Sequence, residues 1–319
     1  MRAFVTGADG FVGQWLLHKL LGDGSSVSGM IRAAKPSLTT LTPELAARAQ
    51  WRQCELSNAA GMRELLRDAK PGAVFHLAAQ SSVPASNEDP RATLETNVLG
   101  TVRLLEAVRE SAPEATVVVV GSAEAYGSVT ADQLPLRESA PLRPRNPYAA
   151  SKAAAEVVAL QYSLSGWVRV IVTRSFNHTG PGQSSAFAAA AFAKQIAGFK
   201  KGGHAAEIRV GNLTPRRDIS DVRDVVNAYV LLAQRGVAGT VYNVCSGRDY
   251  SMREIVDELG RISGMQLNLR EDPALLRPVE TPVLRGDASR IRSDTGWSAT
   301  TPIQTTLTDL LGYYERVAV

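Results

Sequence analysis

Short apolar runs rich in β-branched residues alternate with longer stretches of helical periodicity through the first half of the chain. The runs are apolar at successive positions, which is typical of parallel strands buried on both faces. This alternation predicts a doubly wound α/β fold, in which helices cover both sides of a parallel sheet. The expected strands are Ala3–Thr6, Val27–Ile31, Trp51–Glu55, Ala73–Leu77, Thr116–Val120, Val168–Thr173 and Thr240–Val244, and the expected helices are Phe11–Leu21, Ala59–Arg67, Ala92–Glu110 and Tyr148–Leu164.

The pattern changes after Thr173, where glycine, proline and asparagine become frequent. We expect a smaller second domain here, laid over the carboxyl edge of the sheet, where open α/β sheets bind ligands. The larger domain is expected to comprise residues 1–174, completed by 218–247, and the smaller one residues 175–217 and 248–319. The elements expected after Thr173 are a loop at Ser175–Gln183, an alanine-rich helix to about Lys200, an irregular stretch at Gly202–Pro215, helices at Val222–Gln234 and Met252–Ser263, and a proline-rich loop at Glu271–Arg285.

Composition narrows the class of protein. With 319 residues, 45% of them hydrophobic and 21% charged, the chain has the composition of a globular protein of about two domains. Its longest apolar stretches, Val117–Val120 and Ala186–Ala193, are far below the ~18 residues that a membrane span needs. A secretory leader is not expected, because the strand-like run Arg2–Thr6 leads directly into a glycine-rich turn.

Charge and cysteine content restrict the partners. The formal net charge is +4, and the basic residues are scattered, which argues against nucleic-acid binding and suits a small anionic ligand. Cys54 and Cys245 are far apart and the four histidines are dispersed, so neither a disulfide scaffold nor a metal site is expected. Free cysteines are typical of a reducing compartment, and we expect a cytoplasmic location.

The first candidate motif is the glycine-rich run Thr6–Gly13, between the first expected strand and the first expected helix. Glycine permits a tight turn and a close approach of backbone N–H groups to a pyrophosphate at a helix N-terminus. A purely structural turn is the alternative, but the position within a strand–helix–strand unit favours dinucleotide binding. The expected contacts are Gly7, Gly10, Phe11, Val12 and Gly13.

The end of the second expected strand bears on the choice of cofactor. NAD-selective sites usually place an acidic residue there, about 20 residues after the glycine-rich run, to bind a ribose hydroxyl. This chain has Arg32 instead, and Asp23 falls within the turn Gly22–Ser26. Because arginine can pair with a 2′-phosphate, the sequence favours NADP(H) and leaves NAD(H) as the alternative.

Candidate acid–base residues follow the fifth expected strand. Ser122 and Glu124 come directly after it, where a hydroxyl can bond a substrate oxygen. Tyr148 and Lys152 are four residues apart and share a helix face, where the lysine cation is expected to lower the pKa of the phenol. The structural alternatives are surface positions for Tyr148 and Lys152, a strand-end cap for Ser122 and a solvated carboxylate for Glu124.

These motifs resemble those of the extended short-chain dehydrogenase/reductase family over nearly the whole chain. The glycine-rich run, Ser122, the segment Tyr148–Lys152 and Asn97 stand where that family places them. The second half is similar to the nucleotide-sugar branch, and most similar to the group that uses GDP-mannose derivatives. The similar segments are Phe176–Gln183, Val210–Leu213, Arg217–Asp218, Tyr242–Gly247 and Arg277–Glu280.

The resemblance implies a Rossmann dinucleotide-binding domain with a smaller C-terminal substrate domain, and it adds site residues. Beyond the turn and Arg32, the cofactor is expected to meet Glu55, Leu56, Leu77, Ala78, Ala79, Gln80, Asn97, Tyr148 and Lys152. In a GDP-sugar site, arginines offer bidentate phosphate contacts, a lysine can reach guanine O6, and a carboxylate can accept from ribose hydroxyls. The expected substrate contacts are Ser81, Ser122, Asn177, Lys194, Val210, Arg217, Arg277 and Glu280.

The resemblance also implies an activity: NAD(P)H-dependent reduction of the 4-keto group of a GDP-4-keto-6-deoxyhexose, giving GDP-D-rhamnose. Tyr148 is expected to give the proton, Lys152 to hold the nicotinamide ribose, and Ser122 to bond the developing alkoxide. The main alternative is GDP-mannose 4,6-dehydration, for which Glu124 stands where dehydratases keep a base. Ala123, where sugar-nucleotide dehydratases of another type have an acidic residue, and Gly180–Gln183, which replaces a PRRGE-like stretch, weaken that alternative.

Two other functions are less favoured. A combined epimerase-reductase uses a cysteine near the Ser–Tyr segment, where this chain has none. A non-catalytic nucleotide-binding regulator has no need to keep Ser122, Tyr148 and Lys152 together.

We expect a homodimer, without membrane or nucleic-acid partners. Two expected helices carry more apolar residues than one core-facing stripe needs, and pairing them with their two-fold mates would bury the surplus. These residues are Leu94, Val98, Leu104, Leu105 and Val108 on the first helix and Val157, Val158, Leu160 and Leu164 on the second.

Overall fold

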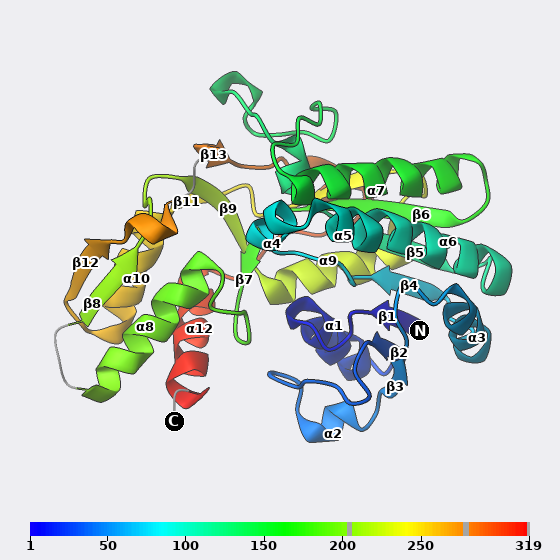
Figure 1. The fold of residues 1–319 in the computed structure, drawn as a ribbon, viewed down its shortest axis with the longest axis horizontal. Coiled ribbons are helices and arrows are strands. Elements are labelled where there is room, and N and C mark those ends of the chain that lie inside the picture. The colour runs from blue at the N-terminus through cyan, green and yellow to red at the C-terminus, as the bar shows by residue number, and fades with distance from the viewer. Residues whose placement is uncertain (203–205, 277–280, 318–319) are drawn as a thin grey trace.

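A seven-stranded parallel sheet forms the centre of the larger part of the molecule (Figure 1). The computed structural model describes residues 1–202, 206–276 and 281–317. All neighbouring strands of this sheet run parallel, so the expected doubly wound α/β fold is confirmed. The strand order is β10-β6-β5-β4-β1-β2-β3, and the bounds are β1 (Arg2–Thr6), β2 (Ser26–Ile31), β3 (Gln50–Gln53), β4 (Ala73–His76), β5 (Thr116–Ser122), β6 (Arg169–Ser175) and β10 (Val241–Val244).

The order of strands in the sheet reverses between β1 and β4. Successive strands β1, β2 and β3 are added toward one edge of the sheet, and β4, β5, β6 and β10 are added toward the other edge. Thr6 at the end of β1 lies opposite His76 at the end of β4. A reversal of this kind opens a crevice at the carboxyl ends of the strands, and open α/β sheets bind their ligands there.

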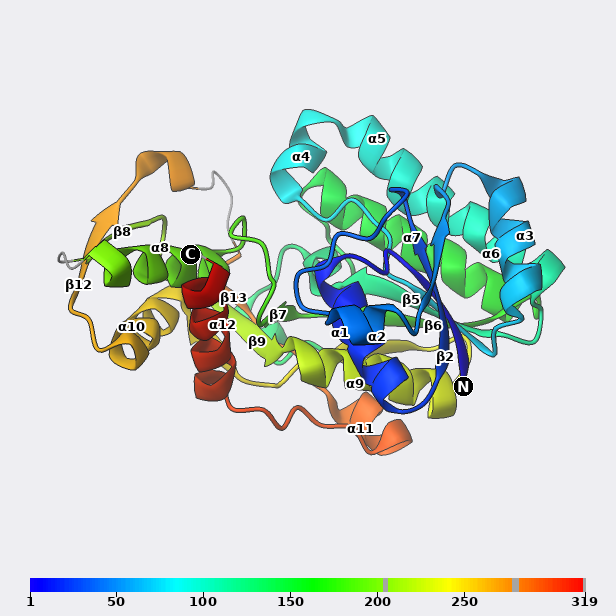
Figure 2. The same cartoon turned by 90° about the horizontal axis from the view of Figure 1, so that it is seen from below.

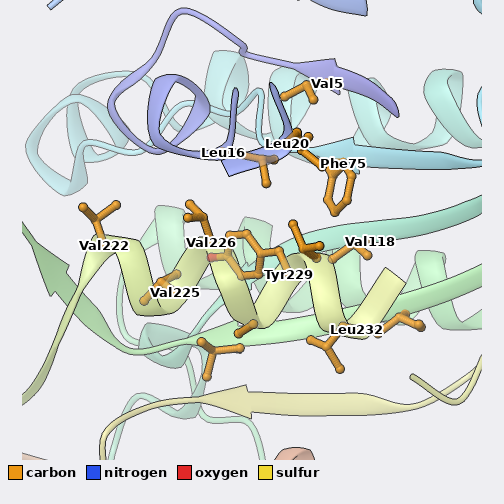
Figure 3. Packing of buried hydrophobic residues seen from close by; sticks show 14 of the residues in the cluster. Val5, Leu16, Leu20, Phe75, Val118, Val222, Val225, Val226, Tyr229 and Leu232 are labelled. Carbon is orange, nitrogen blue, oxygen red and sulfur yellow. The ribbon is translucent and has the colours of Figure 1, made fainter. Parts of the chain in front are cut away.

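Helices cover both faces of the sheet (Figure 2). Figure 3 shows one face, where Val226 and Tyr229 pack against Leu16 from a neighbouring helix and against Phe75 and Val118 from the sheet. Apolar side chains on both faces explain why the strands are apolar at successive positions. The helices are α1 (Phe11–Gly22), α9 (Val222–Arg235) and α11 (Ser289–Thr295) on this face, and α3 (Ala59–Ala69), α6 (Gly100–Ser111) and α7 (Pro147–Leu164) on the other.

The start of α7 is set by its own sequence. The Asn146 side chain accepts a hydrogen bond of 2.8 Å from the backbone N–H of Ala149, and Pro147 occupies the first helical position. Both features favour a helix N-terminus at this point. Tyr148 therefore stands in the first turn of α7, and Lys152 follows one turn later on the same face.

The helix expected over Ala92–Glu110 is found, with a π-helical turn inside it that the sequence did not predict. A short helix, α5 (Pro90–Leu94), is followed by a π-helical turn at Glu95–Leu99, and α6 then begins at Gly100. Within this turn the Asn97 side chain bonds both backbone groups of Gln80, at 2.8 and 3.0 Å. These tertiary bonds hold the wider turn, and π turns of this kind recur at functional sites.

Three segments expected to be loop or irregular contain strands of two small sheets. One of them, β9 (Arg216–Asp221), begins with Arg-Arg-Asp and has no hydrophobic pattern. Its pairing with neighbouring strands makes it a strand. Helices α8 (Ala188–Gly202), α10 (Met252–Ser263) and α12 (Ile303–Val317) pack on these strands in a separate apolar cluster. The strands are β7 (Asn177–Thr179), β8 (Ala206–Val210), β9 (Arg216–Asp221), β11 (Asp249–Ser251), β12 (Leu267–Glu271) and β13 (Val283–Leu284).

The remaining elements are short and lie mainly in connections that the hydrophobic pattern leaves open. They are α2 (Pro43–Ala46), α4 (Val83–Glu88) and 3-10 turns at Ala123–Tyr126, Ala131–Gln133 and Pro273–Leu275. Among the helices of the described ranges, none has both the length and the apolar character needed to cross a membrane.

Candidate active site

The glycine-rich turn lies at the reversal point of the sheet. Gly7 has φ +67°, and a Cβ atom there would lie 2.9 Å from the backbone nitrogen of Ala78. A Cβ at Gly13 would lie 2.2 Å from the carbonyl oxygen of Gly7. Glycine is thus required twice, and the backbone is left bare in front of the N-terminus of α1, where Phe11 and Val12 begin the helix. This cradle fits the pyrophosphate of a dinucleotide.

The other residues expected at the cofactor follow the ends of the neighbouring strands. Leu77, Ala78, Ala79 and Gln80 follow β4, and Ala78 donates its N–H to Thr6 Oγ1 over 3.1 Å. Glu55 and Leu56 follow β3, while Arg32 is exposed directly after β2. Parallel pairing of β1 with β2 and β4, and of β2 with β3, brings these segments to one edge of the sheet.

A buried chain of hydrogen bonds connects the glycine-rich turn to helix α6. His76 Nδ1 lies 2.8 Å from Thr6 Oγ1, and His76 Nε2 lies 3.1 Å from Thr101 Oγ1. Thr101 donates its own proton to the carbonyl of Asn97, so it must accept one from the histidine. His76 is therefore the neutral tautomer with the proton on Nε2. Burial, and secondarily the charge of Lys152, lowers its pKa to about 3.

The same chain continues to the helix that carries the candidate acid. Asn97 donates to Ser151 Oγ over 2.9 Å, and Ser151 donates to the carbonyl of Tyr148 over 2.7 Å. All the donors and acceptors in this chain are compatible in direction. The π turn, the end of β4 and the first turn of α7 are thereby held together.

Ser122, Tyr148 and Lys152 come together at the end of β5. Burial raises the pKa of Tyr148, Ser122 opposes this through a hydrogen bond to the phenol, and the charge of Glu124 adds to the increase. Lys152 donates from Nζ to the carbonyl of Val120 over 2.8 Å, and burial lowers its pKa to about 8. The expected lowering of the tyrosine pKa by Lys152 is therefore not found. The desolvation of both groups outweighs the expected attraction between them.

Glu124 lies in the 3-10 turn that follows β5 and is partly exposed. Its backbone N–H donates to Ser122 Oγ over 3.2 Å, so Ser122 both caps this turn and contacts the phenol of Tyr148. The neighbouring Tyr126 anchors the turn, because its hydroxyl donates to Asn243 Oδ1 over 2.7 Å. The Glu124 charge contributes to the raised pKa of Tyr148, so the carboxylate lies within electrostatic range of the candidate acid.

Two of the residues expected at the nucleotide, Lys194 and Arg217, lie in the smaller part of the molecule. Lys194 is exposed on α8 and lines a hollow of about 520 Å³ with Gln195 and Phe199. Arg217, on β9, donates to the carbonyl of Thr281 over 2.8 Å. The structure thus presents a cation and an aromatic ring in one hollow and a second cation on a strand.

Other expected substrate contacts differ in exposure. Ser81 follows β4 and Asn177 begins β7, and both are exposed. The side chain of Val210 is only 3% exposed and packs in the apolar cluster of the smaller part, so it does not reach a surface. Arg277 and Glu280 lie outside the described residues.

Sequence reasoning missed two buried carboxylates near the site. Asp218 accepts hydrogen bonds from Ser246 N and Oγ, from Gly247 N and from Gly286 N, at 2.7 to 3.3 Å. Burial raises its pKa despite these four donors. Glu156 pairs with Arg174 across the interface of α7 and β6. For Asp218 the sequence signal was its place in the segment Arg217–Asp218, and for Glu156 it was only a charged residue on the inner face of a helix.

Two further features concern metals and thiols. Within the described residues no group of three or more histidine, cysteine or acidic side chains is arranged to hold a metal ion. Cys54 and Cys245 are both free and buried, and burial raises the pKa of each thiol.

Comparison with known proteins is consistent with this site. Residues 4–310 match the family model for GDP-mannose 4,6 dehydratase. A GDP-6-deoxy-D-mannose reductase from Pseudomonas aeruginosa is 38% identical, with 98% of this chain and 97% of the relative aligned. GDP-mannose 4,6 dehydratase 2 from Arabidopsis thaliana is 31% identical over 92% of this chain and 82% of the relative.

A solved structure gives the same result. The structure of RMD from Pseudomonas aeruginosa complexed with NADPH superposes with a TM-score of 0.84 at 35% identity, covering 99% of this chain and all of the other. The family model covers most of the chain, and the relatives align with nearly all of it. The chain belongs to the GDP-mannose 4,6 dehydratase family.

Proposed function

We propose that the protein is an NADPH-dependent reductase that converts the 4-keto group of a GDP-4-keto-6-deoxyhexose to an alcohol, giving GDP-D-rhamnose. The observation that carries this proposal is the cluster of Ser122, Tyr148 and Lys152 beside the glycine cradle. It occurs in a chain that aligns over 98% of its length with a GDP-6-deoxy-D-mannose reductase.

Tyr148 is the proton donor in this proposal. Reduction of a carbonyl creates an alkoxide, which takes a proton from a neutral acid. A phenol whose pKa is raised by burial stays protonated at neutral pH, as a donor must. Ser122, which lies beside the phenol, turns its single hydroxyl proton to the same substrate oxygen when the substrate binds.

Lys152 and the glycine cradle hold the cofactor in this proposal. NADPH, when bound, supplies a hydride from its nicotinamide ring. The N-terminus of α1, which Gly7, Gly10 and Gly13 leave free of side chains, receives the pyrophosphate, and Arg32 pairs with the 2′-phosphate. The relative in complex with NADPH supports this choice of cofactor, with NAD(H) as the alternative. We assign residues 1–174 and 222–247, together with α11, to the cofactor domain, and the two small sheets with α8, α10 and α12 to the substrate domain.

The GDP part of the substrate lies in the smaller domain in this proposal. Arg217 and Arg277 bind phosphate oxygens, and Glu280 accepts from the ribose hydroxyls. Lys194 meets the guanine in the hollow that Phe199 also lines. Ser81 and Asn177 are exposed where they can reach the sugar. Because its side chain is buried, Val210 contributes through its backbone only.

A dehydratase is the second candidate, and Glu124 is the observation that favours it. The carboxylate is close enough to affect the pKa of Tyr148, and a dehydratase would need a base for the C5 proton in this region. Such a reaction starts from GDP-mannose and needs no added reductant, whereas the proposed reductase needs both the 4-keto sugar and NADPH.

The deciding experiment supplies each substrate separately. Purified protein should oxidise NADPH, followed by its absorbance, only when the GDP-4-keto-6-deoxyhexose is present. Tyr148→Phe should lower turnover by ~10²–10⁴-fold, the usual range for a lost general acid, and leave NADP⁺ binding nearly unchanged. Glu124→Gln should lower reduction by less than about tenfold. Formation of a 4-keto sugar from GDP-mannose without added NADPH would instead establish the dehydratase.

We also propose a cytoplasmic homodimer. The two free thiols are compatible with a reducing compartment. Leu94, Leu99, Val157 and Leu164 are exposed apolar residues on α5, the π turn and α7. The expected contribution of Leu104, Leu105 and Val108 is wrong, because these side chains are buried in the core against α3 and the sheet. A two-fold contact through α7 and the π turn would bury the exposed set.

A further inference from the structure

Gln14 lies in α1, directly after the glycine cradle, and is 1% exposed. Its side-chain nitrogen donates to the carbonyls of Asp9, at 2.8 Å, and Ser37, at 3.1 Å. Its side-chain oxygen accepts from the backbone N–H groups of Thr39, Thr40 and Leu41, at 2.8, 3.0 and 3.2 Å. One buried amide thus holds the loop 37–41, because it both donates hydrogen bonds to the loop and accepts hydrogen bonds from it.

The chemistry of this contact is specific to an amide. Two carbonyl acceptors and three N–H donors surround a single side chain, so it must both donate and accept. A carboxylate cannot donate to Asp9 and Ser37, and an apolar side chain would leave five backbone groups without their partner. Because buried polar groups are costly without partners, the loop depends on Gln14 for its position.

The segment 32–36 connects the end of β2 to the loop 37–41 and begins with Arg32. It carries a second exposed cation, Lys35, before it reaches Ser37. Gln14 ties the loop 37–41 to Asp9 in the glycine-rich turn. On another side the same loop abuts the turn after β7, because a Cβ at Gly182 would lie 2.4 Å from Thr40 Cγ2. The loop therefore has little room to shift relative to the cradle.

We propose that Gln14 is a positioning residue for recognition of the cofactor 2′-phosphate. By holding the loop 37–41 at a set distance from the cradle, it keeps the segment with Arg32 and Lys35 where the adenosine end of NADPH lies. This inference rests on the proposed function, since it concerns the NADP(H) preference of the same site. Gln14 itself touches only protein, and its effect passes through the loop.

Equilibrium binding of the oxidised cofactors tests this without any sugar substrate. Dissociation constants for NADP⁺ and NAD⁺ are measured by calorimetry on the wild type, Gln14→Met and Gln195→Met. The control is matched, because Gln195 also clamps backbone, bonding the N–H and the carbonyl of Arg209, but lies far from the cradle in sequence and fold. Gln14→Met should weaken NADP⁺ about tenfold and NAD⁺ less than twofold, whereas Gln195→Met should leave the ratio of the two constants unchanged.

A double variant separates positioning from general loosening. If Gln14 acts through Arg32, then Arg32→Ala should weaken NADP⁺, and adding Gln14→Met should weaken it by less than the product of the two single effects. Equal weakening of NADP⁺ and NAD⁺ by Gln14→Met would overturn the inference, because it would mean that Gln14 serves only the cradle. A wild type without NADP⁺ preference would instead count against the cofactor assignment in the proposed function.

Hydrogen exchange on the unmodified protein tests the same point if Gln14→Met fails to fold. The amides of Thr39, Thr40 and Leu41, bonded to Gln14, should be protected, and NADP⁺ should slow their exchange more than NAD⁺ does. Exchange at the rate of free loop amides, or equal slowing by both cofactors, would contradict the inference.

Discussion

At the scale of single residues, burial governs the candidate acid and its lysine more than their mutual attraction does. Lys152 Nζ donates a hydrogen bond to the carbonyl of Val120. Burial lowers the pKa of Lys152 to about 8 and raises the pKa of Tyr148. In the unfolded chain the lysine has its ordinary pKa of about 10.4. Between these two values the unfolded state binds the proton and the folded state does not.

This difference predicts a pH dependence of stability. Because the unfolded state binds more protons between pH 8 and 10, the contribution of Lys152 to the free energy of unfolding rises with pH in this window. The free energy of unfolding is measured with urea at pH 8 and pH 9.5. Between these two pH values that of the wild type should increase relative to that of Lys152→Met by on the order of 1–2 kcal/mol. Buried tyrosines and cysteines titrate in both proteins, so the difference between them isolates the lysine. Parallel pH profiles would contradict the assignment.

Residues whose role depends on local spacing were predictable from the sequence. The glycines of the cradle are only a few residues apart, and so are Tyr148 and Lys152. Their spacing can therefore be recognised in the amino-acid sequence. Gln14 and His76 were not found, because most of their partners lie 23 or more residues away and carry no motif. Asp218 stands in a recognised segment, but its contacts to Ser246 and Gly247, 28 and 29 residues away, could not be inferred from that segment. Their positions follow from the tertiary fold alone.

At the scale of elements, a buried ion pair joins α7 to β6. Arg174 and Glu156 have side chains 6% and 4% exposed, and two hydrogen bonds of 2.6 and 2.9 Å connect them. The guanidinium also lies 4.7 Å from the ring centre of Tyr126, which anchors the turn of Glu124. The helix that carries the candidate acid is therefore fixed to the sheet through charge as well as through apolar packing.

Removing one partner should cost much of the stability of the fold. Glu156→Gln leaves the Arg174 charge buried with a weaker partner, and the free energy of unfolding should fall by about 3 kcal/mol. Urea unfolding measures this, with Glu258→Gln as control, since Glu258 pairs with the exposed Arg261 on α10. Glu156→Gln with Arg174→Met should recover part of the loss. A change below about 1 kcal/mol in the single variant would show that the pair contributes little.

Elements were predictable where hydrophobic periodicity defines them and not where distant polar contacts do. The strands β1 and β5 and the helices α1 and α7 follow the apolar pattern and were expected close to their bounds. The π turn exists because Asn97 is bonded to Gln80, seventeen positions earlier in the chain. Strand β9 has charged residues at its start, and its pairing with β7, β11 and β13 could not be inferred from their order.

At the scale of the whole molecule, exposed apolar residues on α7 identify the surface expected to form the dimer. Val157 is 63% exposed and Leu164 is 78% exposed. Val157→Glu with Leu164→Glu should give a monomer in light scattering at micromolar concentration, because burying two carboxylates in the contact is costly. Val237→Glu, at another exposed valine, should leave the mass unchanged. A wild-type protein of monomer mass would contradict the dimer.

The edge position of β10 has a consequence for synthesis of the chain. Strand β6 is complete at Ser175, but its outer neighbour begins only at Val241, roughly 65 residues later. At ribosomal rates of about 5–20 residues per second, the outer edge of β6 is without this partner for roughly 3 to 13 s. An open, apolar edge strand is a template for pairing with other chains. The nascent protein therefore passes through an interval in which it needs shielding from its neighbours, and truncation before Val241 would make that interval permanent.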